Sequence, residues 1–143
     1  MEFITKSTAE SKSFGEKFSA DLKGGEVVAL VGDLGSGKTT FVQGLAHGLG
    51  IKRNVNSPTF MLMRSYDIDA TLVKHLYHFD LYRLEGRVEE ELKNIGFYDF
   101  INHKDAVSVI EWGDKATDLL PQNTIWINFE YLNEAERKIT IKQ

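Results

Sequence analysis

The chain has no cysteine among its 143 residues, so it can form neither disulfide bonds nor thiolate metal sites. No run of about eighteen apolar residues occurs, and residues 1–21 lack the hydrophobic segment of a signal peptide. We therefore expect a cytoplasmic protein.

Its formal net charge of −4 argues against a free-standing nucleic-acid binder, which usually carries a basic face. Any contact with RNA is expected to be indirect, through partner proteins.

Size and composition favour one enzyme-like domain spanning residues 1–143. The chain is 42% hydrophobic and 27% charged, which is enough to bury one core but not two. The four histidines show no ligand spacing with acidic residues that would indicate zinc: His47, His75, His78 and His103. We predict no transition-metal site.

Residues 32–39 read Gly-Asp-Leu-Gly-Ser-Gly-Lys-Thr and match the phosphate-binding pattern G-x-x-x-x-G-K-[ST] at every fixed position. The apolar run 27–31 before this P-loop predicts a strand buried on both faces. Residues 39–49 after it predict a helix, with Phe41, Leu45 and Leu49 at helical spacing and Gly50 as a stop. Strand, glycine loop and helix in this order are the context that the motif requires.

This loop predicts a polyphosphate site. Its main-chain N–H groups and the following helix N-terminus attract phosphate oxygens. Lys38 is expected to reach the β- and γ-phosphates, Thr39 to ligate Mg²⁺, and Thr40 to contact the inner phosphates. The expected binding set in the loop itself is Asp33, Leu34, Gly35, Ser36 and Gly37.

The rest of the pattern predicts an α/β fold of the P-loop NTPase type, with a mainly parallel sheet, added antiparallel strands and helices on both faces. The expected elements are a helix capped by Ser7 or Thr8 and ending at Gly24-Gly25, a loop at 54–58, an antiparallel pair at 60–66 and 72–81, a short helix at 85–92, a strand at 107–110, and a hairpin formed by 126–130 and 137–142.

Two carboxylates are candidates for metal binding and hydrolysis. Glu111 follows the strand at 107–110, where P-loop NTPases carry a second acidic motif, and it could coordinate the metal, orient a water, or both. The alternative is a strand-end carboxylate facing solvent. Asp80 interrupts an apolar segment and needs a partner, either Mg²⁺ or a structural ion pair with Arg83.

Three further residues are weaker candidates. Thr59, in Ser57-Pro58-Thr59-Phe60, lies where switch segments sense the γ-phosphate, although this stretch also suits a plain strand start. Trp112, beside Glu111, suits a site or a core position equally, whereas Trp126 is expected in the core. The guanine-reading pattern Asn-Lys-x-Asp is absent, so ATP is the expected nucleotide.

The motifs together resemble the TsaE family, also called YjeE, of small bacterial P-loop ATPases needed for threonylcarbamoyladenosine modification of tRNA. The likeness covers nearly the whole chain. It rests on four segments, in the order and at the spacing of the family: residues 32–41, Ser57-Pro58-Thr59-Phe60, His78-Phe79-Asp80-Leu81-Tyr82-Arg83 and Val109-Ile110-Glu111-Trp112. The family often has Ala where Ser36 stands, which leaves the backbone donors intact.

The resemblance implies roles for particular residues. Lys38 and Thr39 would serve phosphate and Mg²⁺, Glu111 would bind metal or orient water, Asp80 would be needed for hydrolysis, and Thr8 would approach the base. It also implies partners, the transferase TsaD and its paralogue TsaB, in forming N6-threonylcarbamoyladenosine at position 37 of tRNAs.

Hydrolysis by the isolated chain is expected to be slow and partner-stimulated, because no arginine finger is evident. The arginines expected near the site segments are Arg53, Arg64, Arg83 and Arg87 only. Two other functions stay open, a P-loop kinase acting on a small molecule and an assembly module that binds ATP without hydrolysing it.

Overall fold

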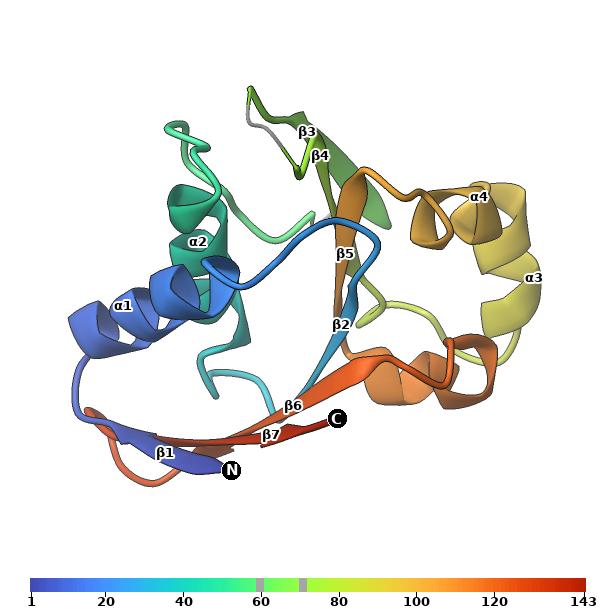
Figure 1. Ribbon diagram of the computed structural model, residues 1–143. Helices are drawn as coiled ribbons and strands as arrows, with labels where there is room; N and C mark the ends of the chain where they lie inside the picture. The colour runs from blue at the N-terminus through green and yellow to red at the C-terminus, as the bar shows by residue number, and fades with distance from the viewer. Residues whose placement is uncertain (59–60, 70–71) are drawn as a thin grey trace.

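Residues 1–58, 61–69 and 72–143 are described by a computed structural model, and within them the chain forms a seven-stranded sheet with helices on both faces (Figure 1). The strand order is β1-β7-β6-β2-β5-β4-β3. This three-layer arrangement confirms the predicted α/β class.

The centre of the sheet is parallel. Its four strands, in spatial order, are β6 (Ile125–Tyr131), β2 (Val27–Val31), β5 (Ala106–Glu111) and β4 (His75–Asp80). Every residue of β5 is buried, as are the first four of β2, because helices cover both faces of a parallel sheet. The strands predicted at 27–31 and 107–110 are therefore confirmed.

Antiparallel strands extend both edges. β3 (Met63–Asp67) pairs with β4, and β7 (Arg137–Lys142) pairs with β6, which confirms both predicted antiparallel pairs. Residue 60, the expected start of the first pair, lies outside the described residues. β1 (Glu2–Thr5) pairs with β7 and was not predicted, because only four residues form it and their partners lie at the far end of the chain.

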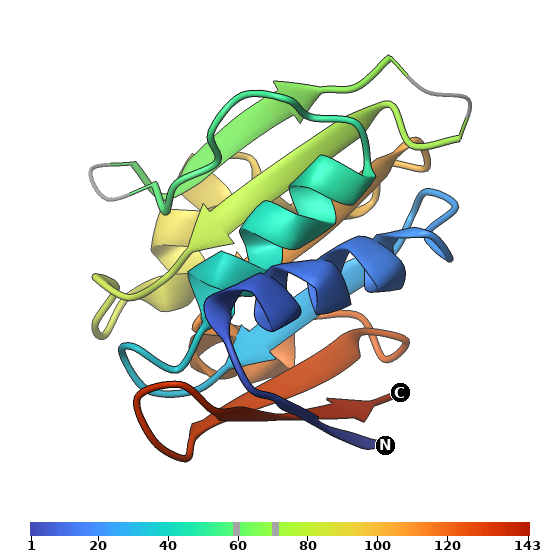
Figure 2. The same cartoon turned by 90° about the vertical axis from the view of Figure 1, so that its left-hand side faces the viewer.

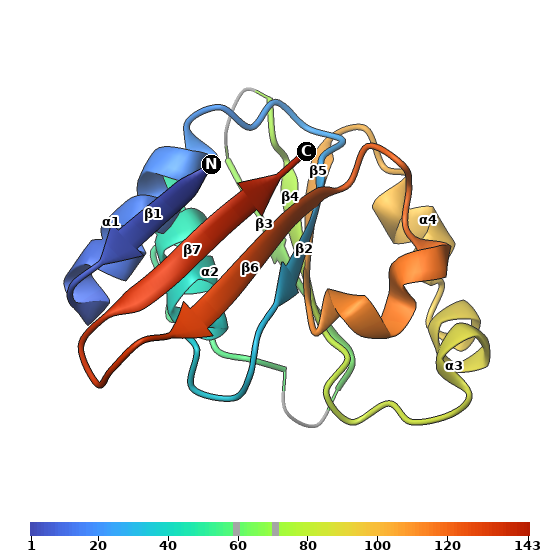
Figure 3. The same ribbon diagram turned by 90° about the horizontal axis from the view of Figure 1, so that it is seen from below.

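Two helices cover one face of the sheet, and shorter helices cover the other (Figure 3). α1 (Thr8–Ser19) and α2 (Lys38–Gly48) lie together on the first face. The second face carries α3 (Val88–Asn94), α4 (Phe97–Ile101) and the 3₁₀ segment η1 (Gly113–Leu119). Each face has its own apolar cluster, one built on Phe41 and Leu45 of α2 and the other on Phe79 of β4 and Phe97 of α4.

α1 and α2 approach closely because glycines lie where they cross. A Cβ on Gly44 would lie 2.0 Å from the Lys12 carbonyl oxygen, and one on Gly15 would lie 2.4 Å from the Phe41 carbonyl oxygen. These distances are far below van der Waals contact, so the crossing excludes any side chain at either position. The close packing of the two helices fixes the position of α1 relative to α2, the helix that follows the P-loop.

Some predicted boundaries were wrong. α1 ends at Ser19 instead of Gly24-Gly25, because a turn follows in which Leu22 donates its N–H to the Ser19 carbonyl while its side chain still enters the core. α3 begins at Val88, after a turn at Gly86 with φ of 78°. η1 was not predicted, since its sequence lacks a helical apolar period and its backbone is kinked at Ala116.

The topology brings distant segments to one edge of the sheet. β2, β4, β5 and β6 are parallel, so their carboxyl ends lie at the same edge (Figure 2). The turn from β6 to β7 lies there as well. β1 and β6 are both antiparallel to β7, so they run in the same direction. The carboxyl end of β1 therefore lies at this edge too, and α1, which follows β1, begins there.

Candidate functional site

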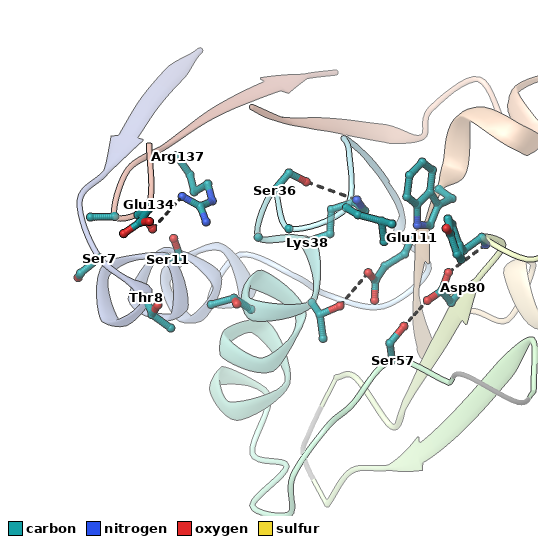
Figure 4. Close-up of a pocket in the computed structure, with 18 residues that line it drawn as sticks. Ser7, Thr8, Ser11, Ser36, Lys38, Ser57, Asp80, Glu111, Glu134 and Arg137 are labelled. Atoms are coloured by element: carbon teal, nitrogen blue, oxygen red, sulfur yellow. Dashed lines mark hydrogen bonds between the residues drawn. The ribbon is translucent and has the colours of Figure 1, made fainter. Parts of the chain in front are cut away.

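A cavity of about 330 Å³ lies at this carboxyl edge (Figure 4). Its lining comes from six places: the start of α1 (Ser7, Thr8, Ser11), the P-loop and the start of α2 (residues 34–40), Ser57, the end of β4 (Asp80, Tyr82), the end of β5 (Glu111, Trp112), and the β6–β7 turn (Glu134, Ala135, Arg137). All predicted site residues within the described part of the chain line this cavity except Asp33, whose exposed side chain lies outside the lining.

The P-loop depends on glycine at its turning points. Gly35 and Gly37 have φ of 77° and 100°, in the left-handed region that other residues rarely adopt. Gly32 approaches β6 so closely that a Cβ would lie 2.5 Å from the Phe129 carbonyl oxygen. α2 starts at Lys38 without a side-chain cap, so the first N–H groups of the helix are free for an anion.

Lys38 is held inside the loop. Its ammonium donates to the carbonyl oxygens of Gly32 and Asp33, the latter at 2.9 Å, and more weakly to the Ser36 hydroxyl at 3.4 Å. Burial lowers the pKa of Lys38, and the nearby carboxylates, Glu111 first, act in the opposite direction. The side chain is a buried cation within reach of negative charge in the cavity.

Glu111 is buried at the end of β5 and is only 3% exposed, so it is not a solvent-facing carboxylate. Its Oε1 accepts a hydrogen bond of 3.0 Å from the Thr39 hydroxyl. Its Oε2 lies 2.6 Å from Nε2 of His78, which is fully buried on β4. The side chain therefore connects the start of α2 to the neighbouring strand.

Asp80 ends the adjacent strand and pairs in register with Glu111. One carboxylate oxygen accepts a hydrogen bond from the Ser57 hydroxyl, and the other accepts one of 3.0 Å from the Tyr82 N–H (Figure 4). The loop at 54–58 thus contacts the carboxylate directly. Thr59, the candidate switch residue, lies outside the described residues.

Trp112 has a special backbone. In the described part of the chain it is the only non-glycine residue with a positive φ, at 59°. This turn brings its indole to 4.3 Å from Lys38 Nζ, measured to the ring centroid, and within 5.1 Å of the Tyr82 ring. Trp112 therefore belongs to the site, whereas Trp126 is half-buried on β6 and does not line the cavity.

The opposite wall comes from the two ends of the chain. Ser7 caps α1 by accepting from the Glu10 N–H at 3.1 Å, and the exposed Thr8 follows it. Ser11 shares a buried hydrogen bond of 2.8 Å with Thr5. This wall faces the P-loop across the cavity (Figure 4).

The arginine that lines the cavity is Arg137, which was not among the arginines predicted near the site. None of the four arginines expected near the site lines the cavity, whereas Arg137, at the start of β7, does. Its Cγ lies 3.7 Å from the position of a Cβ on Gly37. Its Nη1 donates to carbonyl oxygens of the β6–β7 turn, including that of Asn133 at 2.6 Å, and its guanidinium lies 4.5 Å from the Tyr131 ring centroid.

The described residues contain neither a metal-ligand cluster nor a membrane-spanning helix. Among residues 1–58, 61–69 and 72–143, no three histidine, aspartate or glutamate side chains are grouped to hold a metal ion. In the same residues, every helix is too short or too polar to cross a lipid bilayer.

Comparison with known proteins gave consistent matches. A sequence model of the family described as "Threonylcarbamoyl adenosine biosynthesis protein TsaE" matches residues 5–139. The chain is 39% identical over 140 residues to the tRNA threonylcarbamoyladenosine biosynthesis protein TsaE of Bacillus subtilis, covering 98% of this chain and 84% of that protein. It is 38% identical over 141 residues to the protein of the same name from Treponema pallidum, covering 99% of each. The crystal structure of Bacillus subtilis YdiB aligns with a TM-score of 0.75 and 34% identity, over 99% of this chain and 83% of its own.

Proposed function

The chain belongs to the TsaE family of P-loop NTPases, which takes part in tRNA threonylcarbamoyladenosine biosynthesis, and on that premise we propose that it is a magnesium-dependent ATPase. It acts in the cytoplasm and supports a TsaD-like transferase and its TsaB-like paralogue in forming N6-threonylcarbamoyladenosine at position 37 of tRNAs. It contacts tRNA only through that complex.

The observation that carries the proposal is the contact between Thr39 and Glu111 beneath the P-loop. A hydroxyl at the start of α2 lies 3.0 Å from a buried carboxylate at the end of the neighbouring strand, and both face the phosphate-binding loop. A hydroxyl and a carboxylate beside a phosphate-binding loop are the side chains with which P-loop proteins hold Mg²⁺. The burial of Glu111 next to the loop supports a metal site there, and the carboxylate variants below separate hydrolysis from binding alone.

The residues present fit Mg²⁺. The hydroxyl of Thr39 and the carboxylate of Glu111 are hard oxygen donors, and Mg²⁺ is commonly held by one or two protein oxygens together with substrate phosphates and water. When bound, the ion neutralises charge that develops on the phosphates. Thr39 could give a lone pair to the ion while its hydroxyl proton continues to be donated to Glu111.

The remaining roles follow from position. Lys38 and the free N–H groups at the start of α2 bind the β- and γ-phosphates. Asp80, at the end of the strand beside Glu111, is needed for hydrolysis and would help to orient the attacking water. Thr8 and Arg137, on the opposite wall, bind the nucleoside end of ATP.

Slow turnover by the isolated chain is also expected. Among the described residues, Arg137 is the only arginine that lines the cavity, and because we assign it to the nucleoside end, no arginine is left to act as a finger on the transferring phosphate. A partner is therefore expected to complete the site.

The test is phosphate release from ATP and Mg²⁺ by the chain alone and with the transferase pair. We expect slow release alone and a clear increase with the pair. Lys38→Ala, Asp80→Ala and Glu111→Ala should each abolish the increase and fail to support modification in cells. Fast turnover without partners would contradict the proposal. A phosphorylated small molecule would indicate a kinase, and full cellular function of the two carboxylate variants would indicate an assembly module.

A further inference from the structure

A histidine lies behind the nucleotide pocket and has no assigned role. His78 is on β4, two residues before Asp80, and its side chain is 0% exposed. It does not line the cavity, so it cannot touch a bound nucleotide directly. Its neighbours along β4 are apolar, and an aliphatic residue at this position would avoid the cost of burying a polar ring.

The contact that compensates this cost is with Glu111. His78 pairs in register with Val109, so the carboxylate of Glu111 lies diagonally across the two parallel strands. Nε2 of His78 lies 2.6 Å from Oε2 of Glu111, and an ionised carboxylate only accepts hydrogen bonds. The proton of this hydrogen bond is therefore on Nε2.

The other ring nitrogen supports the same assignment. Among the described residues, Nδ1 of His78 is buried and has no hydrogen-bond partner. A proton on Nδ1 would be an unpaired buried donor, which is costlier than an unprotonated nitrogen because the N–H loses its hydration without compensation. The geometry thus places the donor of this hydrogen bond on Nε2.

We infer that His78 is a positioning residue for Glu111. This inference rests on the proposed function, in which Glu111 and Thr39 hold the ion. With Oε2 held by His78, Oε1 is the oxygen that faces Thr39. Without that donor, Oε2 would be buried unpaired, and the carboxylate would turn toward the cavity and leave the Thr39 hydroxyl. Partners in this outer position commonly contribute about 10- to 100-fold to metal affinity or activity.

Three substitutions separate positioning from packing. His78→Gln keeps an N–H donor near the place of Nε2, His78→Asn moves the donor to the place of Nδ1, and His78→Leu removes it. We expect kcat with the transferase pair to fall about 10- to 100-fold in the Leu and Asn variants and to recover largely in the Gln variant. KM for ATP at saturating Mg²⁺ should stay within about threefold, since the phosphate-binding groups are untouched.

A second measurement needs no substitution. Nitrogen NMR of the wild-type chain with ¹⁵N-labelled histidine should show a buried ring that carries a proton on Nε2, and His78→Gln assigns the signal. Addition of Mg²⁺ and ATP should shift this Nε2 resonance, because a cation held by Glu111 would withdraw electron density from the oxygen that accepts this hydrogen bond.

The outcomes separate this inference from the proposed function. Absence of ATP hydrolysis by the wild-type chain with its partners would refute the proposed function itself. If the wild type is active, the inference is overturned by a Leu variant as active as wild type, by an Asn variant equal to the Gln variant, or by an Nε2 that carries no proton. Loss of cooperative melting in all three variants would assign His78 to the core and also overturn it.

Discussion

Replacing Glu111 with glutamine tests the metal site while keeping the shape of the side chain. The amide oxygen can face the Nε2 proton of His78, and the amide nitrogen then faces the Thr39 hydroxyl. Both contacts survive, but the charge is lost and the Thr39 oxygen must accept a hydrogen bond. One of its two lone pairs is thereby occupied and its proton loses its acceptor, which weakens the site that we assign to Mg²⁺.

The structure predicts a small effect on stability and a large one on hydrolysis. Exchanging hydrogen bonds to a charged group for neutral ones costs about 1 kcal/mol, and removing a buried charge offsets part of it. We expect the melting temperature to change by less than about 4 °C. Loss of the carboxylate should lower kcat by about 10²- to 10³-fold, which corresponds to about 3 to 4 kcal/mol of transition-state stabilisation.

The assay is phosphate release with the transferase pair, alongside calorimetric titration with ATP. Glu89→Gln on α3 is the matched control, since it makes the same charge change at an exposed residue outside the cavity. If Glu111→Gln keeps more than about a third of wild-type kcat, the lost transition-state stabilisation is below about 1 kcal/mol. That result would refute the reasoning. Loss of hydrolysis together with a collapsed melting temperature would make the role structural instead.

Three further predictions concern neighbouring contacts. Thr39→Ala should raise the Mg²⁺ concentration needed for half-maximal hydrolysis about tenfold, and Thr39→Ser should restore it; equal Mg²⁺ dependence would exclude Thr39 as a ligand. Arg137→Ala should raise KM for ATP about tenfold in steady-state kinetics, the equivalent of one charge-assisted hydrogen bond, whereas a loss confined to kcat would make it a transition-state residue. Gly44→Ala should destabilise the chain by about 2 kcal/mol in denaturant unfolding, because its Cβ would meet the Lys12 carbonyl at 2.0 Å, while the adjacent Gln43→Ala should not; equal stability would mean that the helices can separate.

Local sequence signals predicted the elements that carry the nucleotide. The buried strand β2, the glycine loop and α2 each have a pattern contained within about a dozen neighbouring residues, since glycine conformation and helical spacing are local properties. The same holds for β5 and for the hairpin of β6 and β7, which were both predicted. The resemblance to the TsaE family was confirmed by the match over residues 5–139.

Features that depend on strand order were missed. Arg137 reaches the cavity only because β6 lies beside β2 and runs parallel to it, and the sequence does not reveal that neighbour. β1 was missed for a similar reason, since its partners are at the other end of the chain. His78 was excluded as a zinc ligand and named as part of the family motif at 78–83, but it received no role of its own, because its partner lies 33 residues away on another strand.

The length of the Glu111 side chain explains why glutamate occupies a position where aspartate is more usual. From the last residue of β5, the carboxylate must reach Thr39 on α2 with one oxygen and His78 on β4 with the other. Its extra methylene gives the carboxylate a longer reach from the β5 backbone than aspartate has. An aspartate at position 111 would sit closer to its own strand, so keeping its contact with Thr39 would draw it away from His78. The buried histidine and the longer acid therefore form one unit, in which His78 on β4 sets the orientation of the Glu111 carboxylate that lines the cavity.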